Sequence, residues 1–221
     1  MRRRALTVDL LEDRTTPVVW NNPWPDPGHL TLSFAPDGTD IQGSPSALFA
    51  DLGSAGGNWQ TEILRAFQTW AAQTNINLSL ASDGTATPFG APGPVQGGTE
   101  HGDIRIGARP LALDELAIST PFDLFGGWAG TVLVNTLRNY SLSAQQSRSA
   151  DGAFDLYTAL LQEAGHIFGL GNSPRPQSAM YTQYLGPRIG LDTTDVADIQ
   201  TLYGARESDR FEGRRGNDDP A

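Results

Sequence analysis

The chain has 221 residues, 38% of them hydrophobic, which is enough for one domain with a sizeable core. It contains no cysteine, so disulfides and thiolate metal sites are excluded, and all 15 of its basic residues are arginine. The formal net charge of −10 argues against nucleic acid or an anionic membrane as the main partner, and no apolar run reaches the length of a transmembrane helix.

Residues 1–27 are expected to form an N-terminal arm. Met1 to Arg4 carry a charge typical of an export signal, but Asp9, Glu12 and Asp13 interrupt the apolar stretch that such a signal needs. Residues 11–17, LEDRTTP, resemble a short segment near the start of many bacterial proteins thought to be exported. The arm therefore has two interpretations, an export-related segment and a disordered extension.

The next elements alternate between strands, one helix and long loops. Strands are predicted at residues 30–34, 76–80, 103–106 and 131–135, from alternating or continuous apolar residues. A helix is predicted over 58–74, with Ile63, Phe67 and Trp70 on its buried face. Residues 82–102 and 108–130 are predicted to be long connections, and the first of them is rich in glycine and proline.

Two more helices are predicted in the last third of the chain. The first covers 151–169, with Phe154, Leu161 and Phe168 recurring at intervals of seven. The second covers 193–203, preceded by Asp192 as a helix start. Residues 205–221 are polar and are predicted to be a disordered tail, which leaves a domain over 28–204.

Residues 162–172, QEAGHIFGLGN, carry the chemically informative pattern. They resemble the zinc signature of matrixins, a branch of the metzincin metallopeptidases, whose pattern is H-E-x-x-H-x-x-G-x-x-H followed by a Met-turn. Four residues fall where the pattern requires them, namely Glu163, His166, Gly169 and Met180. Gln162 replaces the first histidine and Asn172 replaces the third, so the zinc motif is degenerate.

The resemblance covers residues 28–204 and implies a fold class. A matrixin-like domain has an α+β fold with a mixed, twisted β-sheet and about three α-helices. Its active-site helix is followed by the Met-turn and by a C-terminal helix, which here would be the stretch ending in Leu202-Tyr203-Gly204. The structural zinc and calcium sites of matrixins have no matching residues between 108 and 130.

The spacing of the motif explains what the two replacements change. Residues four apart on a helix share one face, so positions 162 and 166 can point at one ion, and a turn at Gly169 would bring position 172 opposite them. Catalytic zinc takes three His, Glu or Cys ligands and keeps one place for water. Only His166 is such a ligand, because the amide oxygens of Gln162 and Asn172 are poor donors to zinc.

Two functions remain open from the sequence. In the first, the resemblance implies zinc and a peptide substrate, with Glu163 as the general base that activates a metal-bound water. In the second, Gln162 and Asn172 hydrogen-bond His166 and each other, and the domain binds an extended peptide without cutting it. The second function is favoured. Tyr181 and Tyr184 could line the cleft, and recruitment of His29 or His101 as a substitute ligand is the remaining alternative.

By the same resemblance the domain is expected to be exported or extracellular, with a peptide or protein partner and no nucleic acid. The sequence leaves the substrate, the export route and the oligomeric state open.

Overall fold

The computed structural model describes residues 23–54, 56–84, 87–122, 126–142 and 152–207. Over these residues the chain forms one 3-10 helix, η1 (Pro27–His29), and four α-helices: α1 (Leu48–Ser54), α2 (Trp59–Ala71), α3 (Leu156–Ile167) and α4 (Thr193–Tyr203). Nine short strands accompany them: β1 (Leu30–Phe34), β2 (Asp40–Ile41), β3 (Ser44–Pro45), β4 (Leu78–Leu80), β5 (Ile104–Arg109), β6 (Ala117–Ser119), β7 (Thr131–Asn135), β8 (Tyr140–Ser141) and β9 (Phe154–Asp155). The fold is α+β, as the sequence predicts, with one α-helix more than expected.

Five strands form the central sheet, in the order β4-β1-β5-β7-β6. The first four run parallel, and β6 is antiparallel to β7 at the edge. The four predicted strands are all present, and every residue of β7 is buried. The edge strand β6 lies inside the stretch that the sequence predicts as a loop.

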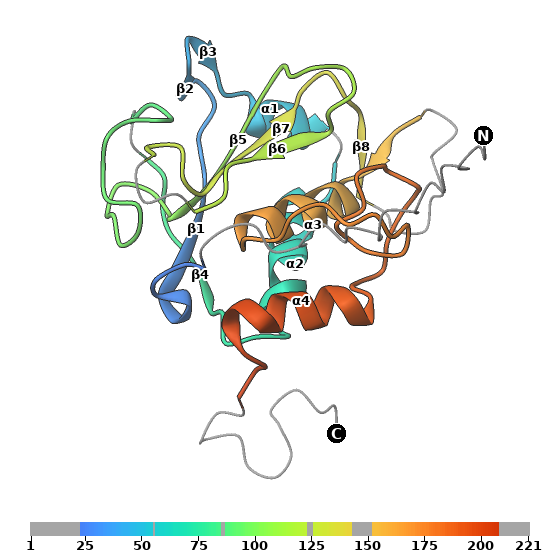
Figure 1. Ribbon diagram of the computed structural model, residues 1–221. Coiled ribbons are helices and arrows are strands. Elements are labelled where there is room, and N and C mark those ends of the chain that lie inside the picture. The colour runs from blue at the N-terminus through green and yellow to red at the C-terminus, as the bar shows by residue number, and fades with distance from the viewer. Residues whose placement is uncertain (1–22, 55, 85–86, 123–125, 143–151, 208–221) are drawn as a thin grey trace, which may run out of the picture.

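Helices α2 and α3 pack against each other beneath the sheet, and α4 closes the far side of this layer (Figure 1). The predicted stripe of α2, Ile63, Phe67 and Trp70, is fully buried. Helix α3 begins five residues later than predicted, because Phe154 and Asp155 pair with β8 instead of starting the helix. Phe154 is therefore half-buried on a strand, whereas Leu161 and Phe168 are in the core as expected.

Helix α4 begins as predicted, at a capping box. The Asp192 carboxylate accepts hydrogen bonds from the backbone N–H groups of Thr194 and Asp195, and the Asp195 carboxylate accepts one from Asp192 N–H. At the other end, the Tyr203 hydroxyl donates to the Phe168 carbonyl and accepts from the Trp24 N–H. The Trp24 indole is buried and donates to the Ile167 carbonyl, so residues just before β1 pack on the end of α3.

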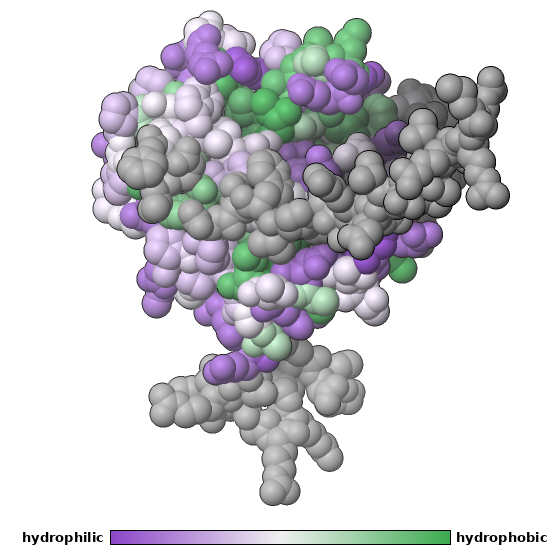
Figure 2. Space-filling model, viewed as in Figure 1, coloured by the Kyte–Doolittle hydropathy of each residue, from purple (hydrophilic) through white to green (hydrophobic). Residues whose placement is uncertain are grey.

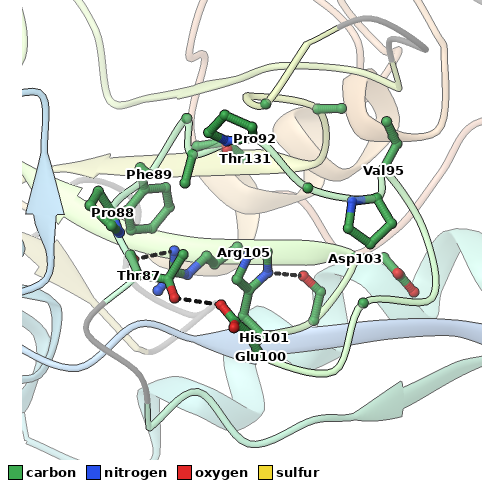
Figure 3. A pocket seen from close by; sticks show the side chains of 18 of the residues that line it. Thr87, Pro88, Phe89, Pro92, Val95, Glu100, His101, Asp103, Arg105 and Thr131 are labelled. Carbon is green, nitrogen blue, oxygen red and sulfur yellow. Dashed lines mark hydrogen bonds between the residues drawn. The ribbon is translucent and has the colours of Figure 1, made fainter.

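The loop from 87 to 103 is irregular, as predicted, and it encloses a cavity of about 360 Å³ (Figure 3). Its base is a buried ion pair in which the Arg105 Nε and Nη2 atoms lie 2.8 and 2.9 Å from the two carboxylate oxygens of Asp83. Arg105 also donates to the Thr87 carbonyl and lies over the Phe89 ring. The Asp103 carboxylate accepts from Thr31 and from the Gly97 N–H. The charged groups Asp83, Arg105 and Asp103, which hold this loop, therefore have hydrogen-bond partners within the protein.

The expected export-related segment lies mostly in residues 1–22, and most of the expected tail lies in 208–221. Both ranges are outside the described residues. No helix in the described ranges is long and apolar enough to span a membrane.

Candidate functional site

Helix α3 carries Gln162, Glu163 and His166. The Glu163 side chain is buried, and Gln162 and His166 are half-buried. The N-cap of the helix is Asp155, whose buried carboxylate accepts hydrogen bonds from both the N–H and the hydroxyl of Thr158. That N-cap satisfies one of the backbone donors that every helix start leaves unpaired. The start of α3, and hence the register of the three residues, is fixed by this contact.

The floor beneath the helix is a close contact between Gly165 and Met180. A Cβ atom added to Gly165 would lie 2.2 Å from Met180 Sδ and 2.9 Å from Trp70 Cζ2, so only glycine fits. Met180 is fully buried, and the turn that carries it is held by Ser178 and Asp195. Met180 is therefore a packing residue under α3.

Gly169 ends the helix and reverses the chain. Its φ of +95° lies in the region that glycine adopts without steric cost. The Leu170 N–H then donates to the Gly165 carbonyl, a C-terminal capping bond. The reversal brings Asn172 back beside the helix, where Gln162 Nε2 lies 3.3 Å from Asn172 Oδ1.

His166 is held from two sides. Its Nδ1 atom lies 2.8 Å from the Leu170 carbonyl oxygen. Because a carbonyl only accepts, Nδ1 carries the proton. The side chain of Asn172 makes a second hydrogen bond to the ring. Burial lowers the pKa of His166, against the opposing effect of both hydrogen bonds, so the ring is neutral at pH 7. Two contacts of the polar network expected from the sequence are therefore present, Gln162 with Asn172 and Asn172 with His166.

Glu163 is buried and contacts the edge strand. The Ser119 hydroxyl lies 2.6 Å from Glu163 Oε2, which joins β6 to α3. Burial raises the pKa of Glu163 to about 8, the Ser119 hydrogen bond opposes that rise, and the nearby Glu115 carboxylate adds to it. The carboxyl group is therefore mainly protonated at pH 7 in this arrangement.

These residues do not fit a catalytic zinc ion. Gln162, His166 and Asn172 come together as the motif predicts, but two of the three offer carboxamides that are already hydrogen-bonded. Within the described parts of the chain, no group of three or more His, Asp or Glu side chains could hold a metal ion. His29 pairs with Asp26, and His101 contacts the Gly102 carbonyl, so neither is brought into such a group.

A cavity of about 250 Å³ opens between α3, β6 and the segment after Met180. Tyr181 and Tyr184 line it, as the sequence suggested, together with Gln162 and Glu163. The larger hollow of the 87–103 loop includes no residue of α3, so the candidate site is assigned to this smaller cleft.

Comparison with known proteins identifies the scaffold. Residues 119–204 match the matrixin family model, a range that includes Gln162, Glu163, His166, Asn172 and Met180. Matrilysin of Rattus norvegicus is 28% identical over 152 residues, which are 65% of this chain and 50% of that protein. Metalloendoproteinase 2-MMP of Arabidopsis thaliana is 32% identical over 145 residues, or 64% of this chain and 36% of the relative. The chain contains a matrixin-type metallopeptidase domain.

The predicted matrixin resemblance is thus confirmed, with the family match over residues 119–204, and so is the predicted fold class. The hatching enzyme of Paracentrotus lividus is 25% identical over 201 residues, 89% of this chain but 28% of that protein. The chain therefore spans half or less of the length of these three relatives.

Two features of the matrixin cleft were not predicted from the sequence. Ser119 is 44 residues away from Glu163 in the chain, and nothing in its local pattern points to α3. The strand that carries it, β6, has only three residues and is stabilised by pairing with β7. Such contacts follow from the sheet topology and carry no local sequence signal.

Proposed function

We propose that this matrixin-type domain binds an extended peptide or protein segment in its cleft and is catalytically impaired, a pseudopeptidase. The observation that carries the proposal is the hydrogen-bonded set of Gln162, His166 and Asn172 at the positions where the matrixin motif has histidines. The retained turn at Met180 is then a Met-turn that keeps its packing role. Fold alone does not establish activity, so the side chains at the site decide.

The donor set argues against a tightly held zinc ion. Catalytic zinc sites use three strong protein ligands, and even changes beyond those ligands cost about 10–100-fold in affinity. Replacing two imidazoles by amides should cost considerably more. Without the ion, Glu163 has no activated water to deprotonate, and its raised pKa leaves it mainly protonated.

Peptide binding needs only the edge of the sheet. Leu116 and Thr120 direct their main-chain groups to β7, because Leu116 O accepts from Asn135 N and Thr120 exchanges bonds with Gly130 and Thr131. Main-chain groups alternate in direction along a strand, so those of Ala117 and Ser119 face the open edge. An extended peptide can pair with them without any metal ion.

A peptide-binding assay tests this proposal. A fluorescein-labelled pool of random decapeptides is titrated with the purified chain, with and without EDTA. We expect saturable binding that the chelator does not change, and loss of binding when Ala117→Pro removes one open-edge N–H. A peptide pool N-methylated at every residue is the matched control, because it has no backbone N–H left on either edge to donate to the strand. Absence of binding would contradict the proposal.

The alternative is a zinc-dependent endopeptidase with an atypical site, and the observation that favours it is the retained Glu163 at the cleft wall. It requires metal-dependent cleavage of casein or a quenched peptide that Glu163→Ala abolishes. We expect the chain to cleave no faster than Glu163→Ala. Cleavage well above that background would replace the binding proposal with this one.

We also propose that the domain works outside the cytoplasm. Support comes from the matrixin relationship and from the likeness of residues 11–17 to a segment of exported proteins. Fractionation of the producing cells, with the chain found in the cytoplasm alone, would contradict this.

A further inference from the structure

The cleft beneath β6 contains an arginine with one buried N–H group for which no described residue supplies an acceptor. Arg138 follows β7, and its side chain lines the cavity. This group is at Nε, which is buried and has no hydrogen-bond partner in the described part of the chain. Among the described residues, no carboxylate lies within ion-pair distance of it. A buried donor without a partner costs free energy, and a ligand that supplies an acceptor recovers it.

Arg138 is held in place by aromatic packing. Its guanidinium carbon lies 5.7 Å from the centroid of the Phe154 ring. Phe154 in turn packs edge-on against Tyr184, with ring centroids 5.1 Å apart. Tyr184 is anchored because its hydroxyl accepts the Asp155 N–H. The cation is therefore positioned before any ligand arrives, which lowers the entropic cost of binding.

The other charged groups of the cavity have partners or contact water. Arg188 donates to the carbonyls of Gln177 and Pro176, and Glu163 accepts from Ser119. Asp114 is exposed and Glu115 is half-exposed, so both carboxylates are hydrated. A basic ligand side chain would find only these solvated carboxylates, whereas an acidic one would find a buried, unpartnered donor. The balance favours the acidic side chain.

Exposed hydrophobic residues flank the lining residues of the cavity in the sequence, and we call these flanking residues the rim. Four large hydrophobic residues with exposures of 53% or more directly adjoin lining residues in the sequence: Leu113 precedes Asp114, Leu137 precedes Arg138, Leu185 follows Tyr184 and Ile189 follows Arg188. Hydrophobic surface gathers at the upper edge of the face drawn in Figure 2, near the loops above β6 and β7 in Figure 1. Exposed apolar residues around a pocket are typical of protein-binding sites.

We propose that the cleft selects an extended peptide segment in which one aspartate or glutamate, flanked by apolar residues, places its carboxylate on Arg138. This inference rests on the proposed peptide-binding function. In a peptide paired with β6, residues opposite Ala117 and Ser119 direct their side chains to the α3 side, where the cavity lies. The neighbouring apolar residues meet the rim. Arg138 is thus the specificity-determining residue of the cleft.

Matched peptides test the proposal. Three fluorescein-labelled nonapeptides of alternating leucine and alanine carry one central glutamate, glutamine or lysine, and their Kd values are measured by anisotropy. We expect the glutamate peptide to bind about tenfold more tightly than the glutamine peptide, since a hydrogen bond to a charged group is the larger kind. The lysine peptide should bind least tightly.

Variants assign the effect to Arg138. In Arg138→Gln, the glutamate and glutamine peptides should bind equally. Arg206→Gln removes the same charge at an exposed position remote from the cleft, and it should keep the preference. Arg138→Glu should prefer the lysine peptide. Equal binding of all three peptides to the unmodified chain, or a preference for lysine, would overturn the inference alone. Failure of every peptide to bind would overturn the proposed function together with it.

Discussion

The two largest of the hollows described above each contain an arginine beside an aromatic ring, and these two arginines differ in one respect. In the 87–103 loop, Arg105 lies 4.5 Å from the Phe89 centroid and is paired with the buried Asp83 carboxylate. In the cleft, Arg138 lies over Phe154 and, among the described residues, has no carboxylate within ion-pair distance. The charge of Arg105 is neutralised by Asp83 within the protein, whereas we propose that the charge of Arg138 is neutralised by a ligand.

This difference distinguishes a cavity that is part of the stable structure from a cavity that is suited to bind a ligand. Buried charges are costly unless they are paired, so a completed pair marks a place where the chain stabilises itself. An incomplete one marks a place where something else is needed. The larger cavity is therefore the weaker candidate for a ligand-binding site, because its charged groups already have partners within the protein.

The largest expected loss of stability occurs when the buried ion pair between Asp83 and Arg105 is broken. Asp83→Asn keeps the shape of the side chain but leaves Arg105 buried without a counterion. Breaking a buried pair from one side costs about 3–5 kcal/mol, so the free energy of unfolding in urea should fall by this amount. Glu62→Gln, which breaks the more exposed pair with Arg65, should cost about 1 kcal/mol or less. Equal losses of unfolding free energy in the two variants would contradict the distinction between the buried and the more exposed ion pair.

Glu163 extends the comparison because it is a buried carboxyl group that forms no ion pair with a cation of the described residues. Its folded-state pKa, about 8, lies above the unfolded value of 4.5, so the folded state holds its proton more firmly. The stability from this group is fully present below pH 4.5 and is lost as pH rises towards 8. Glu163→Gln should therefore raise the free energy of unfolding by on the order of 4–5 kcal/mol at pH 8.5.

The same substitution should change stability little near pH 4.5, where both side chains are neutral. The measurement is a pair of urea titrations at the two pH values for each chain. A gain that is independent of pH would show that burial does not raise the pKa of Glu163.

Next in size is the packed floor of the cleft. Gly165→Ala places a Cβ atom against Met180 and Trp70, and such overpacking should cost about 2 kcal/mol. Gly53→Ala, in α1, meets nothing within 4 Å and should be neutral or slightly stabilising. Thermal unfolding of both variants compares them, and equal melting temperatures would contradict the close packing described here.

The smallest expected effect concerns the unpaired arginine. Arg138→Gln removes no ion pair and should change the free energy of unfolding by less than about 0.5 kcal/mol. A loss comparable with that of Asp83→Asn would show that Arg138 is a structural residue after all. In that case its loss of peptide preference would carry no information about specificity.

Elements with a strong local pattern could be predicted from the sequence. The alternation at Leu30 and Leu32 gave β1, and Asp192 with Asp195 gave the start of α4. Helix α1 was not predicted, because seven residues that include Gly53 show no helical periodicity. Strand β6 was missed because three residues carry no pattern of their own, and their conformation depends on β7.

The candidate site likewise has residues that could be predicted from the sequence and residues that could not. The meeting of Gln162, His166 and Asn172 could be predicted because a helix spacing of four and a glycine turn are local geometry. Ser119 and Arg138 could not, because they reach the cleft through the sheet and through the β8–β9 pairing. Local chemistry was therefore predictable, and the walls of the cleft were not.

Zinc content is the most direct test of the central claim that this site does not hold a catalytic ion. The unmodified chain and the double variant Gln162→His with Asn172→His are purified without added metal, exposed to equimolar zinc, dialysed and analysed by atomic emission. We expect the unmodified chain to retain far less than one equivalent and the variant, which regains three imidazoles, to retain about one. About one equivalent on the unmodified chain would contradict the account.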